Sequence, residues 1–220
     1  MAAWWLLLPA RCAVCGTVGT PLCDTCVRSL VRLAPPLCER CGAPGAWPVR
    51  RCAECAGRRI AFASARSAIA YDDRGRRLVR AWKEGGRRDL AAGAAELVVA
   101  VVARPVVATL TFVPGDRDRG RERGHVPSHR LAVELGRLWA LPVLPLLRRT
   151  RSVRPQRGLP LAERRSNVRG AFASDGAPAG GVCLVDDVYT TGATANACAS
   201  ALRRAGSRHV EVVCLARALR

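Results

Sequence analysis

The sequence has 220 residues, half of them apolar, and its 36 basic residues against 17 acidic ones give a formal net charge of +19. This apolar content is enough for a buried core, so the composition excludes a disordered chain. The charge favours an anionic partner such as a nucleotide, a diphosphate or nucleic acid. However, all but one of the basic residues are arginine, a bias that genome base composition could produce without selection for binding.

The chain begins with an apolar stretch from Ala2 to Ala10. This stretch is much shorter than the ~20 residues of a membrane span, and no basic residue precedes it. The run at 90–103 is also too short to cross a bilayer. We therefore expect a short packed segment at the start, no membrane span and a cytoplasmic location.

Eight of the 11 cysteines occur within the first 55 residues, as four Cys-x-x-Cys pairs. Two such pairs complete the tetrahedral four-sulfur shell of a closed structural zinc site, so eight cysteines predict two structural Zn²⁺ ions. Pairing of neighbouring motifs is the simplest arrangement, and an interleaved one remains open. Disulfides are disfavoured in a reducing cytosol. The predicted ligands are Cys12, Cys15, Cys23, Cys26, Cys38, Cys41, Cys52 and Cys55.

The cysteine-rich segment has few long apolar runs, so metal binding should supply its folding free energy. We assign residues 1–60 to a double zinc-ribbon module and residues 61–220 to a second domain. The remaining cysteines, Cys183, Cys198 and Cys214, lie in strand-like or helical patterns. We expect them to be small buried apolar residues rather than nucleophiles.

From about residue 62 onward, short apolar runs alternate with helical patterns. Strands are predicted at 66–71, 106–113, 142–147, 182–185 and 210–216. Helices are predicted around residues 78–82 and at 89–104, 127–140 and 194–205. This alternation predicts an α/β fold with a mostly parallel sheet, whose ligands bind beyond the carboxyl ends of the strands.

The strand at 182–185 is followed by two acids, Asp186 and Asp187, which we expect just beyond its carboxyl end. Carboxylates are hydrogen-bond acceptors, so a neighbouring pair suits the vicinal hydroxyls of a ribose or a magnesium shell. The sequence Thr190-Thr191-Gly192-Ala193-Thr194 then leads into a helix, where free amides, hydroxyls and the helix dipole favour an anion. Together these features predict a pocket for a ribose 5-phosphate.

Two other interpretations compete. An apolar run ending in two acids could be a Walker B strand, but the chain contains no G-x-x-x-x-G-K-[ST] motif. A capped helix after a solvated acidic turn would explain one threonine but not the complete order of residues.

The stretch VCLVDDVYTTGAT resembles the phosphoribosyl pyrophosphate signature of type I phosphoribosyltransferases. That resemblance implies that Asp186 and Asp187 hold the ribose hydroxyls, as binding and catalytic residues. It also implies that Thr190, Thr191, Gly192, Ala193 and Thr194 hold the 5-phosphate.

Four Cys-x-x-Cys motifs before such a domain resemble the ComF family of bacterial competence-associated proteins. The resemblance extends to AYDDRGRRLVRAWKEGGRRDLA, FVPGDRDRGRERGHVPSHRLAVELG and RRTRSVRPQRGLPLAERRSNVRGAF. One departure stands at 123–127, where this chain has Arg-Gly-His-Val-Pro and the family commonly has Arg-Gly-Phe-Asn-Gln. This chain therefore lacks the Asn and Gln side-chain amides that the family commonly has at these positions.

Two further segments could complete the site. Backbone amides and guanidinium groups after the strand at 106–113 suit a diphosphate. The predicted pyrophosphate ligands are Pro114, Gly115, Arg117, Arg123 and the lone lysine, Lys83, although a lysine at a helix end is often only solvated. Residues 148–170 resemble a hood over the site, with Gln156, Arg164 and Asn167, and an exposed basic loop is the alternative.

The resemblance implies a protein that binds phosphoribosyl pyrophosphate (PRPP) with Mg²⁺ and is linked to DNA uptake. If it is catalytic, it would displace magnesium pyrophosphate from C1 of the ribose in favour of an acceptor that the sequence does not identify. The alternative is a non-catalytic PRPP-binding protein that engages single-stranded DNA or competence proteins through its zinc ribbons and basic surface. With 5 tryptophans, 2 tyrosines and 3 phenylalanines, a dedicated base-stacking platform is disfavoured.

Overall fold

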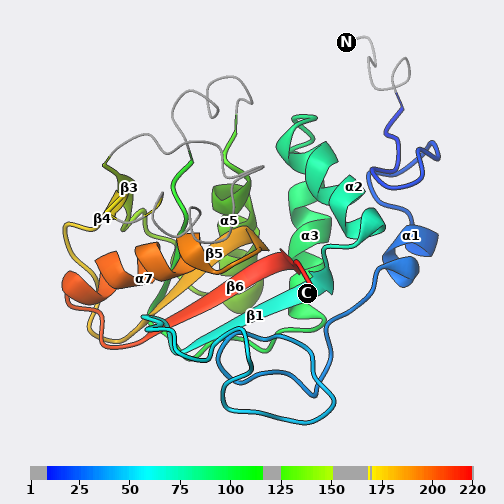
Figure 1. Ribbon diagram of the computed structural model, residues 1–220. Coiled ribbons are helices and arrows are strands. Elements are labelled where there is room, and N and C mark those ends of the chain that lie inside the picture. The colour runs from blue at the N-terminus through cyan, green and yellow to red at the C-terminus, as the bar shows by residue number, and fades with distance from the viewer. Residues whose placement is uncertain (1–8, 116–124, 151–167, 169, 220) are drawn as a thin grey trace, which may run out of the picture.

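The computed structural model describes residues 9–115, 125–150, 168 and 170–219 (Figure 1). Its centre is a four-stranded sheet in the order β1-β6-β5-β2. The strands are β1 (Ser64–Ala70), β2 (Thr109–Phe112), β5 (Val182–Tyr189) and β6 (Val210–Arg217). Every pairing in this sheet is parallel, so the carboxyl ends of all four strands lie at one edge.

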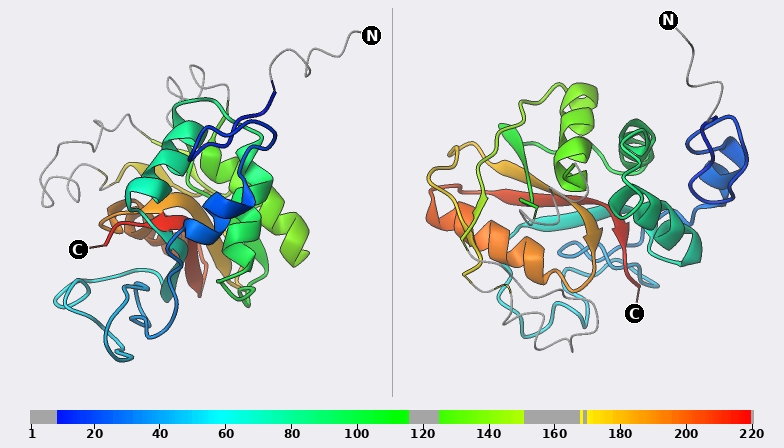
Figure 2. Two further views of the ribbon diagram at one scale, coloured as in Figure 1. Left: turned by 90° about the vertical axis from the view of Figure 1, so that its right-hand side faces the viewer. Right: turned by 90° about the horizontal axis from the view of Figure 1, so that it is seen from above.

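Helices cover both faces of the sheet. Helices α2 (Asp73–Lys83), α3 (Leu90–Val99) and α5 (Pro127–Trp139) lie on one face, and α7 (Ala193–Arg204) lies on the other (Figures 1 and 2). Side chains alternate between faces along a strand, so Cys183 and Val185 enter the first core, whereas Val182 and Leu184 enter the core beneath α7. The predicted α/β class with a parallel sheet is confirmed.

Local sequence explains the ends of α2. Asp72 caps its start, because the Asp72 carboxylate accepts a hydrogen bond from the Gly75 amide at 2.9 Å. Leu78, Val79 and Trp82 are all buried, which turns the opposite, arginine-rich side of the helix outward. The helix ends at Lys83, whose ammonium group lies beside Asp187 in β5.

Three predicted strands differ from the structure, and the one at 106–113 is shorter than expected, spanning Thr109–Phe112. The one at 142–147 is wrong, because only Val143 forms a bridge, to Leu110. Pro142 and Pro145 lack amide hydrogens, so this segment cannot continue a strand ladder. The chain instead forms a small antiparallel pair of β3 (Arg148–Arg149) and β4 (Phe172–Ala173). The strand predicted at 182–185 is longer than expected, because its pairing with β6 continues to Tyr189.

The cysteine-rich segment contains one helix, α1 (Asp24–Ser29), and otherwise consists of turns. We call residues 9–34 the first ribbon and residues 36–60 the second ribbon. The first ribbon packs beside α2 and α3, and the second lies against the opposite face of the sheet (Figure 2). Within the described residues, no helix is long and apolar enough to cross a membrane.

Candidate functional site

The eight paired cysteines form two separate clusters, with ligand atoms within 4.8 Å of one another in each. The clusters are Cys12, Cys15, Cys23 and Cys26, and Cys38, Cys41, Cys52 and Cys55. All eight are free thiols, so no disulfide competes with metal binding. Neighbouring motifs therefore pair, as in the simpler predicted arrangement, and the interleaved one is excluded.

The two clusters share their backbone geometry. In the first, the Cys23 amide donates to Cys12 Sγ at 3.5 Å, and in the second the Cys52 amide donates to Cys38 Sγ at 3.3 Å. Although burial acts in the opposite direction, such backbone donors lower the pKa of Cys12 to about 6 and that of Cys38 to about 7. Burial raises the pKa of other ligands, such as Cys26 and Cys41, so the convergence of four sulfurs in each cluster is what fits Zn²⁺, which binds thiolates. With all four ligands supplied by protein, both sites are closed and structural.

The three other cysteines are not part of these clusters. Cys183, Cys198 and Cys214 are fully buried in the sheet or in α7. Burial raises the pKa of each thiol, so they remain neutral apolar groups. The prediction that they are core residues rather than nucleophiles agrees with this placement.

The two acids lie within the last half of β5 rather than beyond its end, which corrects the sequence-based expectation. Asp187 is buried, and its Oδ2 lies 2.7 Å from Nζ of Lys83, at the end of α2. The ammonium group thus compensates a carboxylate whose side chain is only 9% exposed. The structure brings the lone lysine to the acid pair.

Asp186 has a different environment. Its Oδ1 accepts a hydrogen bond from the Asp187 amide at 2.9 Å, and its position in β5 is on the same strand face as Val182 and Leu184, toward α7. Burial, followed by repulsion from Asp187, raises the pKa of Asp186 to about 7, although Lys83 acts in the opposite direction. Adjacent residues of a strand face opposite sides, so the two carboxylates flank the strand near its carboxyl end.

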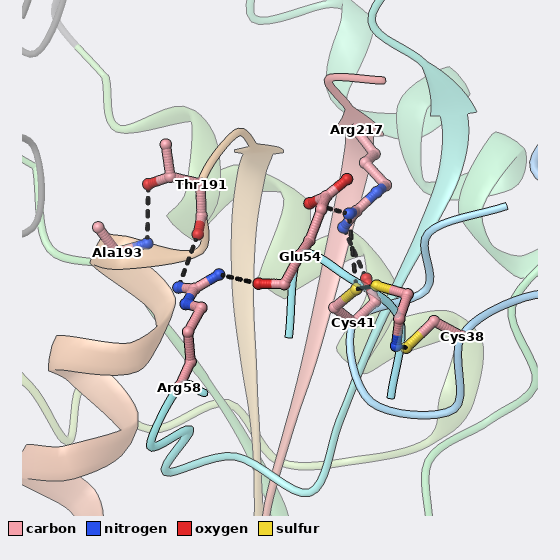
Figure 3. Close-up of polar contacts among 8 residues, drawn as sticks. Cys38, Cys41, Glu54, Arg58, Thr191, Ala193 and Arg217 are labelled. Carbon is pink, nitrogen blue, oxygen red and sulfur yellow. Dashed lines mark hydrogen bonds and ion pairs between the residues drawn. The ribbon is translucent and has the colours of Figure 1, made fainter. Parts of the chain in front are cut away.

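The threonine loop joins β5 to α7. Gly192 has φ +71°, in the left-handed region, and a Cβ at this position would overlap the Tyr189 hydroxyl. Thr191 Oγ1 accepts a hydrogen bond from the Ala193 amide at 3.2 Å (Figure 3). A left-handed residue at the start of a helix turns backbone amides toward one side, which is a common arrangement for binding anions. Thr190 and Thr194 flank this turn.

The other predicted site residues are only partly described. Pro114 and Gly115 follow β2 at the same edge of the sheet as the acids, because β2 runs parallel to β5. The Pro114 carbonyl accepts a hydrogen bond from Arg149 Nη2 at 3.4 Å. The remaining predicted ligands lie outside the described residues; they are Arg117, Arg123, Gln156, Arg164 and Asn167.

Sequence analysis missed the contacts between the second ribbon and the loop. Arg58 Nη2 donates to the Thr191 carbonyl at 2.9 Å, although the two residues are 133 positions apart. Arg217, at the end of β6, donates to the Cys41 carbonyl and to the Glu54 carboxylate (Figure 3). No local motif distinguishes these arginines in a chain with so many of them.

Comparison with known proteins gives three similar relatives and one domain family. The double zinc ribbon domain family matches residues 3–57. The chain is 30% identical over 231 residues to the DNA utilization protein YhgH of Salmonella typhi, covering 97% of this chain and 100% of that protein. The protein of the same name from Salmonella typhimurium is 29% identical over 232 residues, with the same coverage. Competence protein F of Haemophilus influenzae is 36% identical over 111 residues, or 48% of either chain.

These similarities cover both the zinc clusters and the sheet domain. The domain match covers all eight cysteines of the two clusters, and the YhgH alignments also cover the acid pair and the threonine loop. The chain therefore belongs to the ComF family, with a double zinc ribbon preceding a parallel α/β sheet.

Proposed function

We propose that the protein binds PRPP together with Mg²⁺ at the carboxyl end of β5. The observation that supports this proposal is the succession of Asp186 and Asp187, in the last half of β5, and the left-handed Gly192, at the start of α7. Carboxylate acceptors suit a sugar diol, and a helix-start turn suits a phosphate group. A ribose 5-phosphate carries both groups on one small molecule.

Each residue has a distinct role in this proposal. Asp186 and Asp187 accept hydrogen bonds from the ribose hydroxyls, and the amides around Gly192 bind the 5-phosphate. Lys83 offsets the charge of Asp187 and contributes positive charge beside the diphosphate. Pro114 and Gly115 contribute backbone to the diphosphate side. Magnesium, when bound with the ligand, would offset the negative charge of the diphosphate.

Transfer of the phosphoribosyl group is the reaction that fits such a site. A nucleophilic atom of the acceptor would form a bond to C1 while the bond from C1 to the pyrophosphate oxygen breaks, and the acceptor would release its proton. The contribution of the carboxylates would be to hold the ribose in a fixed orientation during this displacement. Pyrophosphate release measured across a panel of nucleobases tests this step, because a non-catalytic binder releases none with any base.

Binding itself is tested by calorimetry with PRPP and Mg²⁺ on the zinc-loaded protein. We expect saturable binding and a raised melting temperature for the wild type. The double variant Asp186→Asn and Asp187→Asn should lose both effects, whereas Asp175→Asn, at an exposed acid paired with Arg148, should retain them. An unchanged affinity in the double variant would refute the assignment of the diol site.

A second function, in DNA handling, is favoured by one surface feature. The outward side of α2 carries Arg77 and Arg80, both exposed, and the relatives bear the names DNA utilization protein and competence protein. We propose that this side contacts the phosphates of single-stranded DNA. Replacing both arginines with alanine should weaken retention of an oligonucleotide and lower its dependence on salt, while PRPP binding is unchanged.

A further inference from the structure

The second zinc cluster is connected to the threonine loop by a continuous set of polar contacts (Figure 3). At the cluster, Arg217 Nη1 donates to the Cys41 carbonyl at 2.6 Å, and Arg217 Nη2 lies 3.5 Å from Cys41 Sγ. The same Nη2 donates to Glu54 Oε2 at 2.8 Å. Glu54 lies between two cysteine ligands in the sequence, so metal binding would fix its position as well.

Arg58 connects Glu54 to the threonine loop. Its Nη1 donates to the Glu54 carbonyl at 3.1 Å, and its Nη2 donates to the Thr191 carbonyl at 2.9 Å. One planar guanidinium group therefore joins the backbone of the second ribbon to the backbone of the loop. The guanidinium group is rigid and planar. A fixed Glu54 carbonyl therefore also fixes the direction in which Arg58 Nη2 donates to the Thr191 carbonyl.

The contact to Thr191 has a consequence for the neighbouring amide. The peptide bond between Thr191 and Gly192 is trans and planar, so its carbonyl and its N–H point in opposite directions. Holding the Thr191 carbonyl toward Arg58 therefore keeps the Gly192 N–H directed away from the ribbon. This is the orientation that a backbone anion site at the start of α7 requires.

The first ribbon has no comparable connection within the described residues. Its contacts with the sheet domain are apolar packing of Cys12 and Cys26 near α2 and α3, hydrogen bonds from Arg74 to the Ser29 carbonyl and from Arg87 to the Arg11 carbonyl, and backbone hydrogen bonds of residues 31–33 with β1. These contacts involve α2, the segment between α2 and α3, and β1, and none of them involves residues 190–194. The two clusters are therefore equivalent as metal sites but not in what they contact.

We propose that Arg58 is a positioning residue for the threonine loop, and that the second zinc cluster controls the anion affinity of this loop through Arg217, Glu54 and Arg58. The identity of the anion, a ribose 5-phosphate, rests on the proposed function above. The orientation of the loop does not rest on it and can be measured without ligand.

The test compares Arg58→Ala with Arg59→Ala in the full-length, zinc-loaded protein. Arg59 is the matched control, because it is exposed, adjacent and forms no hydrogen bond or ion pair within the described residues. Hydrogen exchange of peptides spanning 190–196 is measured without ligand, and calorimetry is performed with ribose 5-phosphate and, separately, with pyrophosphate. Zinc content confirms that both clusters remain intact.

We expect Arg58→Ala to accelerate exchange at 190–196 and to weaken ribose 5-phosphate binding by about tenfold or more, as for loss of a hydrogen bond to a charged group. Pyrophosphate binding should be unchanged, whereas a general loss of structure would weaken both. Arg58→Lys keeps one donor but not the fork, so its loss should be smaller. Glu54→Gln keeps the backbone carbonyl that Arg58 contacts, and its loss should be smaller still.

Equal exchange and equal affinity in Arg58→Ala and Arg59→Ala would overturn the inference. If the wild type does not bind ribose 5-phosphate at all, the proposed function fails. The exchange measurement then decides the inference alone: faster exchange at 190–196 in Arg58→Ala supports it, and unchanged exchange refutes it.

Discussion

The two zinc clusters have almost the same local geometry and very different surroundings. In each, a backbone amide of the third cysteine donates to the sulfur of the first. The first cluster, however, packs on α2 and α3, whereas the second contacts the end of β6 and the threonine loop. A repeated metal-binding unit has thus been placed on both faces of one sheet. The difference indicates that the role of a structural metal site depends on which parts of the protein the residues around its ligands contact.

The largest expected effect comes from removing one cluster at a time. Cys12→Ser and Cys38→Ser should each lower the zinc content from two ions per chain to about one. Both should lower the melting temperature, because metal binding supplies folding free energy to segments with little core. Only Cys38→Ser should also greatly weaken ribose 5-phosphate binding. Metal analysis and calorimetry check this, and equal losses of affinity would contradict the comparison.

A second prediction concerns the loop that the second cluster contacts. Gly192→Ala forces a side chain into a left-handed conformation and against the Tyr189 hydroxyl. We expect a loss of at least about 1–2 kcal/mol of stability from the backbone conformation alone. Ribose 5-phosphate binding should disappear while two zinc ions remain bound. Thermal unfolding, calorimetry and metal analysis measure these effects, and retained binding would show that the phosphate lies elsewhere.

The third prediction concerns α2, the helix that the first ribbon supports. Lys83→Met leaves the Asp187 carboxylate without the ammonium group that lies 2.7 Å away, and should cost about 1–3 kcal/mol. Asp187→Asn should cost less, because the Lys83 side chain is 33% exposed and can be solvated. Chemical denaturation provides both values, and Lys83→Arg serves as the control that keeps the charge. The opposite ranking would mean that solvent, rather than Lys83, compensates Asp187.

The smallest expected effect is the pH dependence of Asp186. Its folded-state pKa of about 7 lies above the ordinary value of 3.8, chiefly because the carboxyl of this half-buried residue is desolvated. The stability contributed by the protonated carboxyl is therefore complete below about pH 4 and is lost as the pH rises through the folded pKa. Asp186→Asn, which cannot ionise, should be more thermostable than the wild type at pH 8, with a smaller difference at pH 5. Melting curves in magnesium-free buffer test this, and a difference independent of pH would argue against the raised pKa.

Short-range patterns explain how much of this architecture the sequence could predict. The zinc sites could be predicted from the spacing of the cysteines between Cys12 and Cys55, because each Cys-x-x-Cys turn brings two sulfurs together locally. The strand, acid and threonine order at 182–194 is equally local, and the parallel sheet follows from alternating elements. The pairing of β5 with β6 as far as Tyr189 is not local. For this reason the sequence predicted a strand that ended at residue 185, before the two acids.

Long-range polar contacts could not be predicted from the sequence. The contacts of Arg58 with Thr191 and of Arg217 with Cys41 join residues 133 and 176 positions apart. An arginine that bonds a distant carbonyl has no local signature, since any of the many arginines could satisfy the same acceptor. In contrast, the sequence itself contains evidence against the strand predicted at 142–147, because Pro142 and Pro145 cannot donate backbone hydrogen bonds. The apolar pattern of this segment nevertheless favoured a strand.

The central claim is that the turn between β5 and α7 holds the phosphate of a ribose whose hydroxyls contact the adjacent acids. A crystal structure of the zinc-loaded protein with PRPP and Mg²⁺ tests it most directly. The account predicts the 5-phosphate within hydrogen-bonding distance of the Gly192 amide and the ribose hydroxyls at Asp186 and Asp187. A ligand bound at another edge of the sheet, with this turn unoccupied, would contradict it.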